Sequence, residues 1–363
     1  MRVIAIVLLM SFAILFCGKD ITDISVPVRI SQAPLYLNMV ELNLAHKIEM
    51  LGGEYNIPYI QDYEIDEDGN VYVMSRASEI AVFDPEGNYI QSIGQPGDGP
   101  EDIRSPYYLA YGNRKLYIYE KPFDIKILTK QGKYVGKIFG IPGNLTFFDV
   151  YGDNYCAVLF YHDFSQTWRY TINLYSETFE KIRQIKEYIV DKDQEFHFNP
   201  RYSTVIDSRG NIVIPNSSSE FLLNKYDPDG NLLFQFGREY KRQKYSEDAR
   251  KVFDKYASDP VTIQMNFGKK MQMAEYPPVI RHIFADQDDN FWVMSGEIHG
   301  DVDRVKEVIV DIFSNDGGWL YTLQTKNVNL RSKIVNGRLY TATKIISIDA
   351  QQYIKVFDIT YDH

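Results

Sequence analysis

The sequence predicts an all-β fold in which a unit of four antiparallel strands is repeated six times. Three observations predict it. A tight turn rich in Asp, Gly and Asn recurs along the 363 residues, alternating apolar residues follow each copy, and the copies are spaced by roughly one such unit. Asp-Gly and Gly-Asn permit the positive φ angles of hairpin turns, and period-2 alternation beside a turn marks a half-buried strand.

The first copy shows the pattern clearly. Residues 66–73 read Asp-Glu-Asp-Gly-Asn-Val-Tyr-Val, and a second turn follows within residues 83–89. Each unit therefore contains a pair of hairpins. The equivalent first turns of the six units are marked by Gly69, Gly112, Asp153, Gly210, Asp289 and Gly337.

The spacing of these markers identifies the architecture. Successive markers lie 43, 41, 57, 79 and 48 residues apart, and a four-stranded propeller blade needs about 40 to 50 residues. The two long spacings indicate insertions. The sequence therefore predicts a six-bladed β-propeller of four-stranded antiparallel blades, in one domain because each blade buries its faces against its neighbours.

The largest insertion is expected between the fourth and fifth blades, at about residues 238–277. Within it, Ser246 can cap the N-terminus of a short helix. The apolar side of that helix would comprise Ala249, Val252, Phe253 and Tyr256. The sequence thus predicts a small helical decoration on one face of the ring.

The segment before the first unit has a predicted role in closing the ring. Residues 46–51 can supply the outermost strand of the last blade, because propellers remove unpaired edges by such closure. Residues 17–44 would form a tether and a strap over the surface, leaving 45–363 as the propeller.

Composition limits the classes of function. Hydrophobic residues make up 45% of the chain and aromatics 14%, enough for a large core. The formal net charge of −10 argues against a nucleic-acid partner, which rewards clustered Lys and Arg. The local basic run at residues 241–244 is interpreted as a solvated face.

The N-terminus predicts export. Arg2 precedes an apolar segment that ends at Phe16, so residues 1–16 have the form of a signal peptide. Cys17 follows as a candidate lipidation site in the mature protein. Phe16 stands where a small residue is usual, so cleavage after Ala13 and a retained membrane anchor remain alternatives; the apolar run is short for a span.

A family resemblance rests on two glycine-rich loops and on the hairpins. Residues 94–101 read Gly-Gln-Pro-Gly-Asp-Gly-Pro-Glu and lead to Pro106 and a strand, with a shorter copy at residues 140–143. These loops look like the blade connections of NHL-type propellers. With Cys17, the chain resembles the six-bladed, NHL-like lipoproteins of bacterial cell envelopes, which implies a lipid-anchored protein in the cell envelope; a secreted or periplasmic soluble protein is the alternative.

The acidic turns also invite a metal interpretation. Residues 66–70 and 286–290 echo the start of a calcium loop, but neither has the bidentate Glu that completes one. Asp and Asn favour such turns for their own backbone hydrogen bonds. We therefore expect no cofactor, with calcium as the alternative, and no catalytic or metal-ligating residues are assigned. No His-metal, nucleophile-elbow or phosphate-loop motif is found.

Ligand binding is expected on the face where the innermost strands begin. Arg forks onto carboxylates, and Tyr stacks while donating a hydrogen bond. The candidate residues are Arg104, Tyr107, Tyr108, Asn199, Arg201, Tyr202, Tyr276, Arg281 and His282. The competing interpretation is that these side chains fill the channel and pair with the backbone.

Two hypotheses of function follow. The first is an exported, lipid-anchored interaction module for a protein, peptide or glycan partner, without catalysis. The second is a metal-dependent propeller enzyme, of the lactone hydrolase or lyase type, with its site in the central channel. The enzyme requires carboxylates and amides from several blades to converge, and the sequence shows no such constellation.

Overall fold

The structure is a computed structural model. It describes residues 26–37, 40–51, 55, 57–120, 123–162, 167–191, 200–260, 263, 273–295, 307–343 and 352–361. Two predicted residues, Cys17 and Asn199, lie outside this part of the chain.

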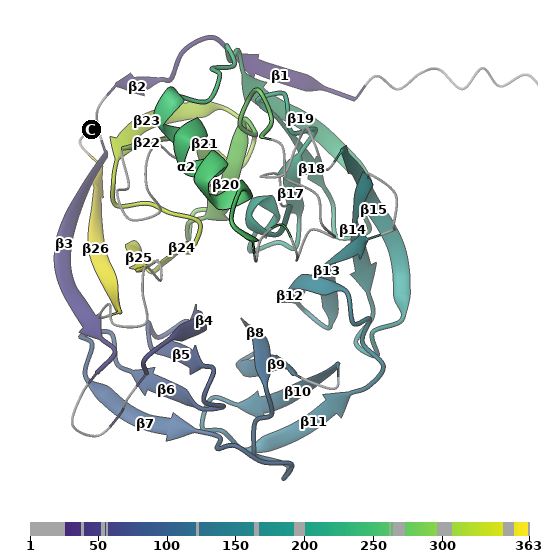
Figure 1. The fold of residues 1–363 in the computed structure, drawn as a ribbon, viewed down its shortest axis with the longest axis vertical. Coiled ribbons are helices and arrows are strands. Elements are labelled where there is room, and N and C mark those ends of the chain that lie inside the picture. Colours follow the sequence, from purple (N-terminus) through teal and green to yellow (C-terminus); the bar gives the residue numbers. More distant parts are fainter. Residues whose placement is uncertain are drawn as a thin grey trace, which may run out of the picture.

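Six antiparallel sheets are arranged in a ring, with one strand of each closest to the central axis (Figure 1). The first blade consists of β4 (Ile60–Ile65), β5 (Val71–Ser75), β6 (Ile80–Phe83) and β7 (Tyr89–Ile93). The second consists of β8 (Pro106–Gly112), β9 (Lys115–Glu120), β10 (Asp124–Thr129) and β11 (Tyr134–Ile138). The third consists of β12 (Leu145–Tyr151), β13 (Asn154–His162), β14 (Thr167–Tyr175) and β15 (Lys181–Asp191).

The last three blades follow the same plan. The fourth blade consists of β16 (Val205–Ile206), β17 (Ile212–Pro215), β18 (Leu222–Tyr226) and β19 (Leu232–Arg238). The fifth consists of β20 (Ile280–Ala285), β21 (Phe291–Ser295), β22 (Val308–Phe313) and β23 (Trp319–Thr325). The sixth consists of β24 (Ser332–Val335), β25 (Arg338–Ala342), β26 (Tyr353–Tyr361) and β3 (Val40–Glu49). The predicted fold class, a six-bladed β-propeller, is confirmed.

The six sequence markers all fall at the same place in their blades, between the first and second strands. Gly69 has φ +87°, Gly210 φ +81° and Asp289 φ +60°, which are left-handed values that Gly and Asp tolerate. The recurring turn motif is therefore the local cause of the repeat.

The ring is closed by the N-terminal strand. β3 pairs antiparallel with β26 over the whole of that strand, from Val40 opposite Tyr361 to Glu49 opposite Tyr353. The closing strand is thus present but begins earlier than residues 46–51, and residues 40–44, assigned to the strap, belong to it. The reason is that β26 is nine residues long and its partner follows it to the end.

The preceding residues line the outside of two other blades. β1 (Val28–Ser31) pairs parallel with β19, and β2 (Tyr36–Leu37) pairs parallel with β23. These pairs add a fifth strand to the fourth and fifth blades, at the rim of the ring (Figure 1). The strap therefore covers edges that would otherwise expose unpaired backbone groups.

The insertion between the fourth and fifth blades contains the predicted helix, α2 (Glu247–Ala257). The backbone N–H of Arg250 donates to the carbonyl of Ser246 at 3.0 Å, so the first turn begins where the cap was expected. Phe253 and Ala257 are buried on one side of the helix. No helix among the described residues has the length and apolarity needed to cross a bilayer.

The hydrophobic core lies between neighbouring blades. One cluster joins Tyr63 and Phe83 of the first blade to Tyr340 and Val356 of the sixth, with Ile48 of the closing strand. Another joins Trp292 of the fifth blade to Leu339 of the sixth. Each blade is stabilised by its neighbours, as radial repeats require.

Candidate functional site

The strand order gives the ring two faces with different connections. The turns between first and second strands, and those between third and fourth strands, lie on one side, which we call the turn face. The links between blades, and the turns between second and third strands, lie on the other side. We call this the mouth face, because every innermost strand begins there.

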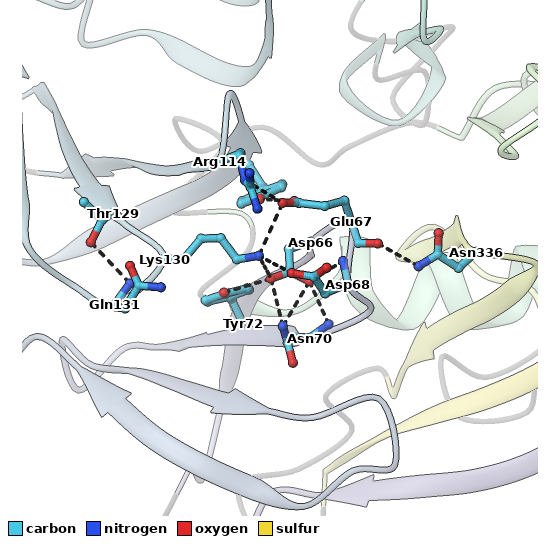
Figure 2. A network of polar contacts seen from close by, with 11 residues as sticks. Asp66, Glu67, Asp68, Asn70, Tyr72, Arg114, Thr129, Lys130, Gln131 and Asn336 are labelled. Carbon is cyan, nitrogen blue, oxygen red and sulfur yellow. Dashed lines mark hydrogen bonds and ion pairs between the residues drawn. The ribbon is translucent and has the colours of Figure 1, made fainter.

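On the turn face, the acidic motif of the first blade is a structural junction. The Asp66 carboxylate accepts hydrogen bonds from the backbone N–H groups of Asp68 and Asn70, both at 2.9 Å, and from the Tyr72 hydroxyl at 3.1 Å. Lys130, from the second blade, places its ammonium 2.7 Å from Asp66 and 2.6 Å from Asp68 (Figure 2).

Burial alone would raise the pKa of Asp66, but hydrogen bonds from Asn70 and Lys130 outweigh it and the pKa lies below the usual value. The Asp66 carboxylate thus binds the backbone of its own turn and the Lys130 ammonium of the neighbouring blade. Asp286 has the same role, accepting from Asn290 N at 2.9 Å and from the Trp292 indole at 3.2 Å. Within the described part of the chain, no group of three or more His, Cys, Asp or Glu residues is placed to hold a metal ion.

The glycine-rich link between the first and second blades also has a structural role. Gly99 N donates to the Asp102 carboxylate at 2.8 Å, and a Cβ on Gly97 would lie 2.2 Å from the same oxygen. The loop therefore closes around Asp102, which needs glycine at that approach. Arg104 follows it, paired with exposed Asp98 at 2.8 Å.

On the mouth face, His282 is a buried link between blades. Its Nδ1 lies 2.5 Å from the carbonyl oxygen of Tyr202, in η1 (Pro200–Ser203), and its Nε2 lies 3.0 Å from the carbonyl of Ser332. Burial lowers the pKa of this imidazole, with the two carbonyls opposing that shift. Since both ring nitrogens face backbone, His282 holds the fourth, fifth and sixth blades together.

The other predicted residues fall into two groups. Tyr107 and Tyr108 begin β8 and lie beside each other, with ring centroids 6.4 Å apart. Arg281 begins β20, across the ring, and Tyr276 lies in the insertion that precedes it. Arg201 lies in η1, and its side chain is outside the described part of the structure.

A row of aromatic and polar side chains extends from Tyr107 and Tyr108 over the first and second blades. The Arg76 guanidinium lies 4.3 Å from the Tyr59 ring centroid, and its Nε donates to Gln61 Oε1 at 2.9 Å. Gln61 in turn donates to the carbonyl of Tyr107 at 3.1 Å. We call the set Tyr59, Gln61, Arg76, Tyr107, Tyr108, Tyr119 and Phe123 the mouth belt.

The far end of the mouth belt is stacked and reaches solvent. The Tyr108 and Tyr119 rings are 5.9 Å apart and nearly parallel, at 5°, and Phe123 stacks on Tyr119 at 6.4 Å. Phe123 is 39% exposed and has φ +84°, a rare conformation for a bulky residue. Such strain recurs at ligand-binding sites.

A second polar group lies on the innermost strands, around the axis. The Lys333 ammonium is 2.5 Å from Glu64, and 33% of the Lys333 side chain is exposed. Burial raises the pKa of Glu64 to about 7, with Lys333 opposing the shift. Burial also raises the pKa of Asp149 on β12. Lys333 is thus shared by carboxylates of other blades, and they raise its pKa against the opposing effect of its partial burial.

Sequence reasoning missed most of these partners. Arg76 and Phe123 lie in short turns between second and third strands, where no periodic pattern marks a side chain. Glu64 and Lys333 had a weak signal, a charged residue within an otherwise strand-like apolar segment. Cys156 is a small buried residue, and burial raises the pKa of its thiol.

Comparison with known proteins agrees with this architecture. A member of the DUF4221 family from Bacteroides vulgatus superposes with a TM-score of 0.53, covering 90% of this chain and 99% of that one at 11% identity. The similarity shows the fold alone. A chain of a mitotic checkpoint complex matches less well, with a TM-score of 0.44 and 9% identity. No family model and no curated protein matches the sequence.

Proposed function

We propose that this chain is an exported, lipid-anchored, NHL-like propeller that acts as a non-catalytic interaction module. Its partner would be a protein, peptide or glycan of the bacterial cell envelope, bound on the mouth face without a cofactor. Residues 1–16 and Cys17 support export and anchoring through their sequence pattern.

The mouth belt is the observation that carries the interaction. It combines flat aromatic surface with the Arg76 guanidinium, 4.3 Å from a ring centroid, and with the half-buried amide side chain of Gln61. Aromatic and Arg side chains of this kind dominate binding energy at interfaces. These side chains lie at the starts of two adjacent innermost strands and in the neighbouring turns, so the blades give them a rigid support.

The test is thermal unfolding of the exported chain with a panel of envelope glycans and peptides, with calcium and with a chelator. A ligand of the folded state at about 100 times its Kd stabilises it by about 2.7 kcal/mol. We expect the double variant Arg76→Ala/Phe123→Ser to lose that stabilisation. The control is Ile182→Ser, which removes a 57% exposed apolar side chain from the rim.

Stabilisation of both variants alike would contradict the role of the mouth belt. A rise with calcium alone that the chelator reverses would favour the metal-dependent enzyme instead. A ligand effect without a calcium effect supports the interaction module.

A further inference from the structure

The insertion gathers positive charge on a protein whose net charge is −10. Arg242 and Lys244 lie on the segment before α2, Arg250 lies on α2, and Arg281 begins β20. We call these four residues the insertion cations. Three of them share one structural centre, the pair Glu275 and Tyr276, and Arg281 adjoins it through Tyr245.

Contacts place the insertion cations around that centre. The Tyr276 ring centroid is 4.6 Å from the Arg242 guanidinium and 5.8 Å from the Lys244 ammonium. Lys244 pairs with the Glu275 carboxylate at 2.5 Å. The Glu275 carbonyl accepts from Tyr245 N at 3.3 Å and from Arg250 Nη2 at 3.2 Å.

One carboxylate, that of Glu275, acts on three of these cations. The pKa of Glu275 is lowered, first by Lys244 and then by Arg250 and Arg242. Among the described residues, no carboxylate lies within ion-pair distance of Arg242, Arg250 or Arg281. In sequence, residues 238–277 hold nine Lys and Arg against six Asp and Glu, so the insertion carries an excess of positive charge.

Two of the guanidinium groups are also poorly satisfied. The Nε of Arg242 is buried and has no hydrogen-bond acceptor among the residues that the structure describes. Arg281 has the Tyr245 hydroxyl as its polar neighbour, and burial lowers its pKa. Burying a cation without an anion costs free energy, so both positions favour an incoming carboxylate.

We propose that the insertion cations bind an acidic peptide segment of a partner protein. Arg242 and Lys244 are two residues apart and approach the same ring. Side chains at this spacing in an extended chain are separated by about 6.6 Å, the repeat of carboxylates at alternate positions of an extended peptide. The guanidinium group of Arg binds such carboxylates through two parallel hydrogen bonds. This site lies outside the mouth belt and does not depend on it.

The experiment is fluorescence anisotropy with the full chain and a labelled peptide of about twelve residues that alternates Glu and Ser. A peptide of Gln and Ser is the neutral probe, and polygalacturonate is the glycan competitor. We expect the Glu peptide to bind, the Gln peptide not to bind, and binding to weaken as salt rises.

The double variant Arg242→Gln/Lys244→Gln is expected to weaken binding at least about tenfold, which is 1.4 kcal/mol. Lys133→Gln is the matched control, since it removes an exposed cation that pairs with Glu101 at 3.5 Å elsewhere. Far-UV circular dichroism confirms that each variant is folded. Arg281→Met tests the buried position separately.

Equal binding of the Gln peptide, unchanged binding by the double variant, or polygalacturonate bound in place of the peptide would overturn the inference. Arg76→Ala/Phe123→Ser separates it from the proposed function. That variant is expected to bind the acidic peptide as the wild type does. Loss of peptide binding in that variant would assign the peptide to the mouth belt instead.

Discussion

The ammonium of Lys130 lies 2.7 Å from the buried carboxylate of Asp66, and the two residues belong to adjacent blades. The turn that defines the sequence repeat therefore also joins one blade to the next. Asn336 of the sixth blade donates to the Glu67 carbonyl at 3.0 Å, so the same turn contacts both neighbours (Figure 2).

Lys130→Met is expected to destabilise the fold by about 2 to 4 kcal/mol, because it leaves the buried Asp66 carboxylate without its cation. Urea unfolding at neutral pH measures the change. Lys133→Met, at a 72% exposed position, is the control and should change stability by less than about 0.5 kcal/mol. Equal effects of the two changes would show that the junction contributes little.

The Asp66 junction also predicts an acid limit. The pKa of Asp66 is lowered in the folded state, so its stabilisation is present above the ordinary value of 3.8 and is lost as pH falls through the folded value. We expect the difference between the wild type and Asp66→Asn to shrink below about pH 4. A difference that stays constant down to pH 2.5 would contradict this assignment.

Lys333→Met is expected to show the opposite pH window. Glu64 has a folded pKa of about 7, raised from 4.5, so the favourable contribution of this carboxyl is complete below 4.5 and is lost as pH rises through 7. Removing Lys333 should therefore cost more at pH 8.5, about 1 to 3 kcal/mol, than at pH 5.5, where Glu64 is largely protonated. Unfolding at both values measures this, and an equal cost would refute it.

The closing strand predicts a matched pair of core and surface variants. Ile48 is 1% exposed in the cluster between the sixth and first blades, whereas Leu44 on the same strand is 52% exposed. Ile48→Ala should cost about 2 to 5 kcal/mol and Leu44→Ala less than about 1. Thermal unfolding compares them; similar costs would mean that ring closure does not depend on Ile48.

Lipid anchoring predicts a change in labelling. Cys17→Ser should abolish incorporation of labelled palmitate and move the protein from the membrane fraction. A Cys156→Ser variant should keep the label, because that thiol is 1% exposed inside β13. Labelling that persists in Cys17→Ser would exclude this anchor and favour a soluble or transmembrane form.

Much of the fold was predictable because the repeat is local. The positive φ of Gly69 and the alternation in β5 follow from neighbouring residues alone. The extent of the closing strand was not predictable, since Val40 pairs with Tyr361 across most of the chain. The length of the closing strand depends on the length of its partner β26, and the residues near Val40 carry no local pattern that indicates it.

The candidate site was predictable only in part. Tyr107 and Tyr108 lie at the start of an innermost strand, as the sequence predicted, and their rings pack at a tilt of 43°. Their partners Arg76 and Phe123 lie in turns, where a side chain's neighbours depend on how adjacent blades meet. His282 proved to be enclosed between blades, because each of its ring nitrogens lies within hydrogen-bond distance of a backbone carbonyl.

The sequence by itself determined the six-fold repeat, the hairpin turns and the position of the helical insertion, because turn chemistry and strand alternation act over a few residues. The tertiary structure decided which charges meet: Lys130 with Asp66, Lys333 with Glu64, and Lys244 with Glu275. Those encounters join residues up to 269 positions apart. Ring closure brings Lys333 to Glu64, and the packing of consecutive blades brings Lys130 to Asp66.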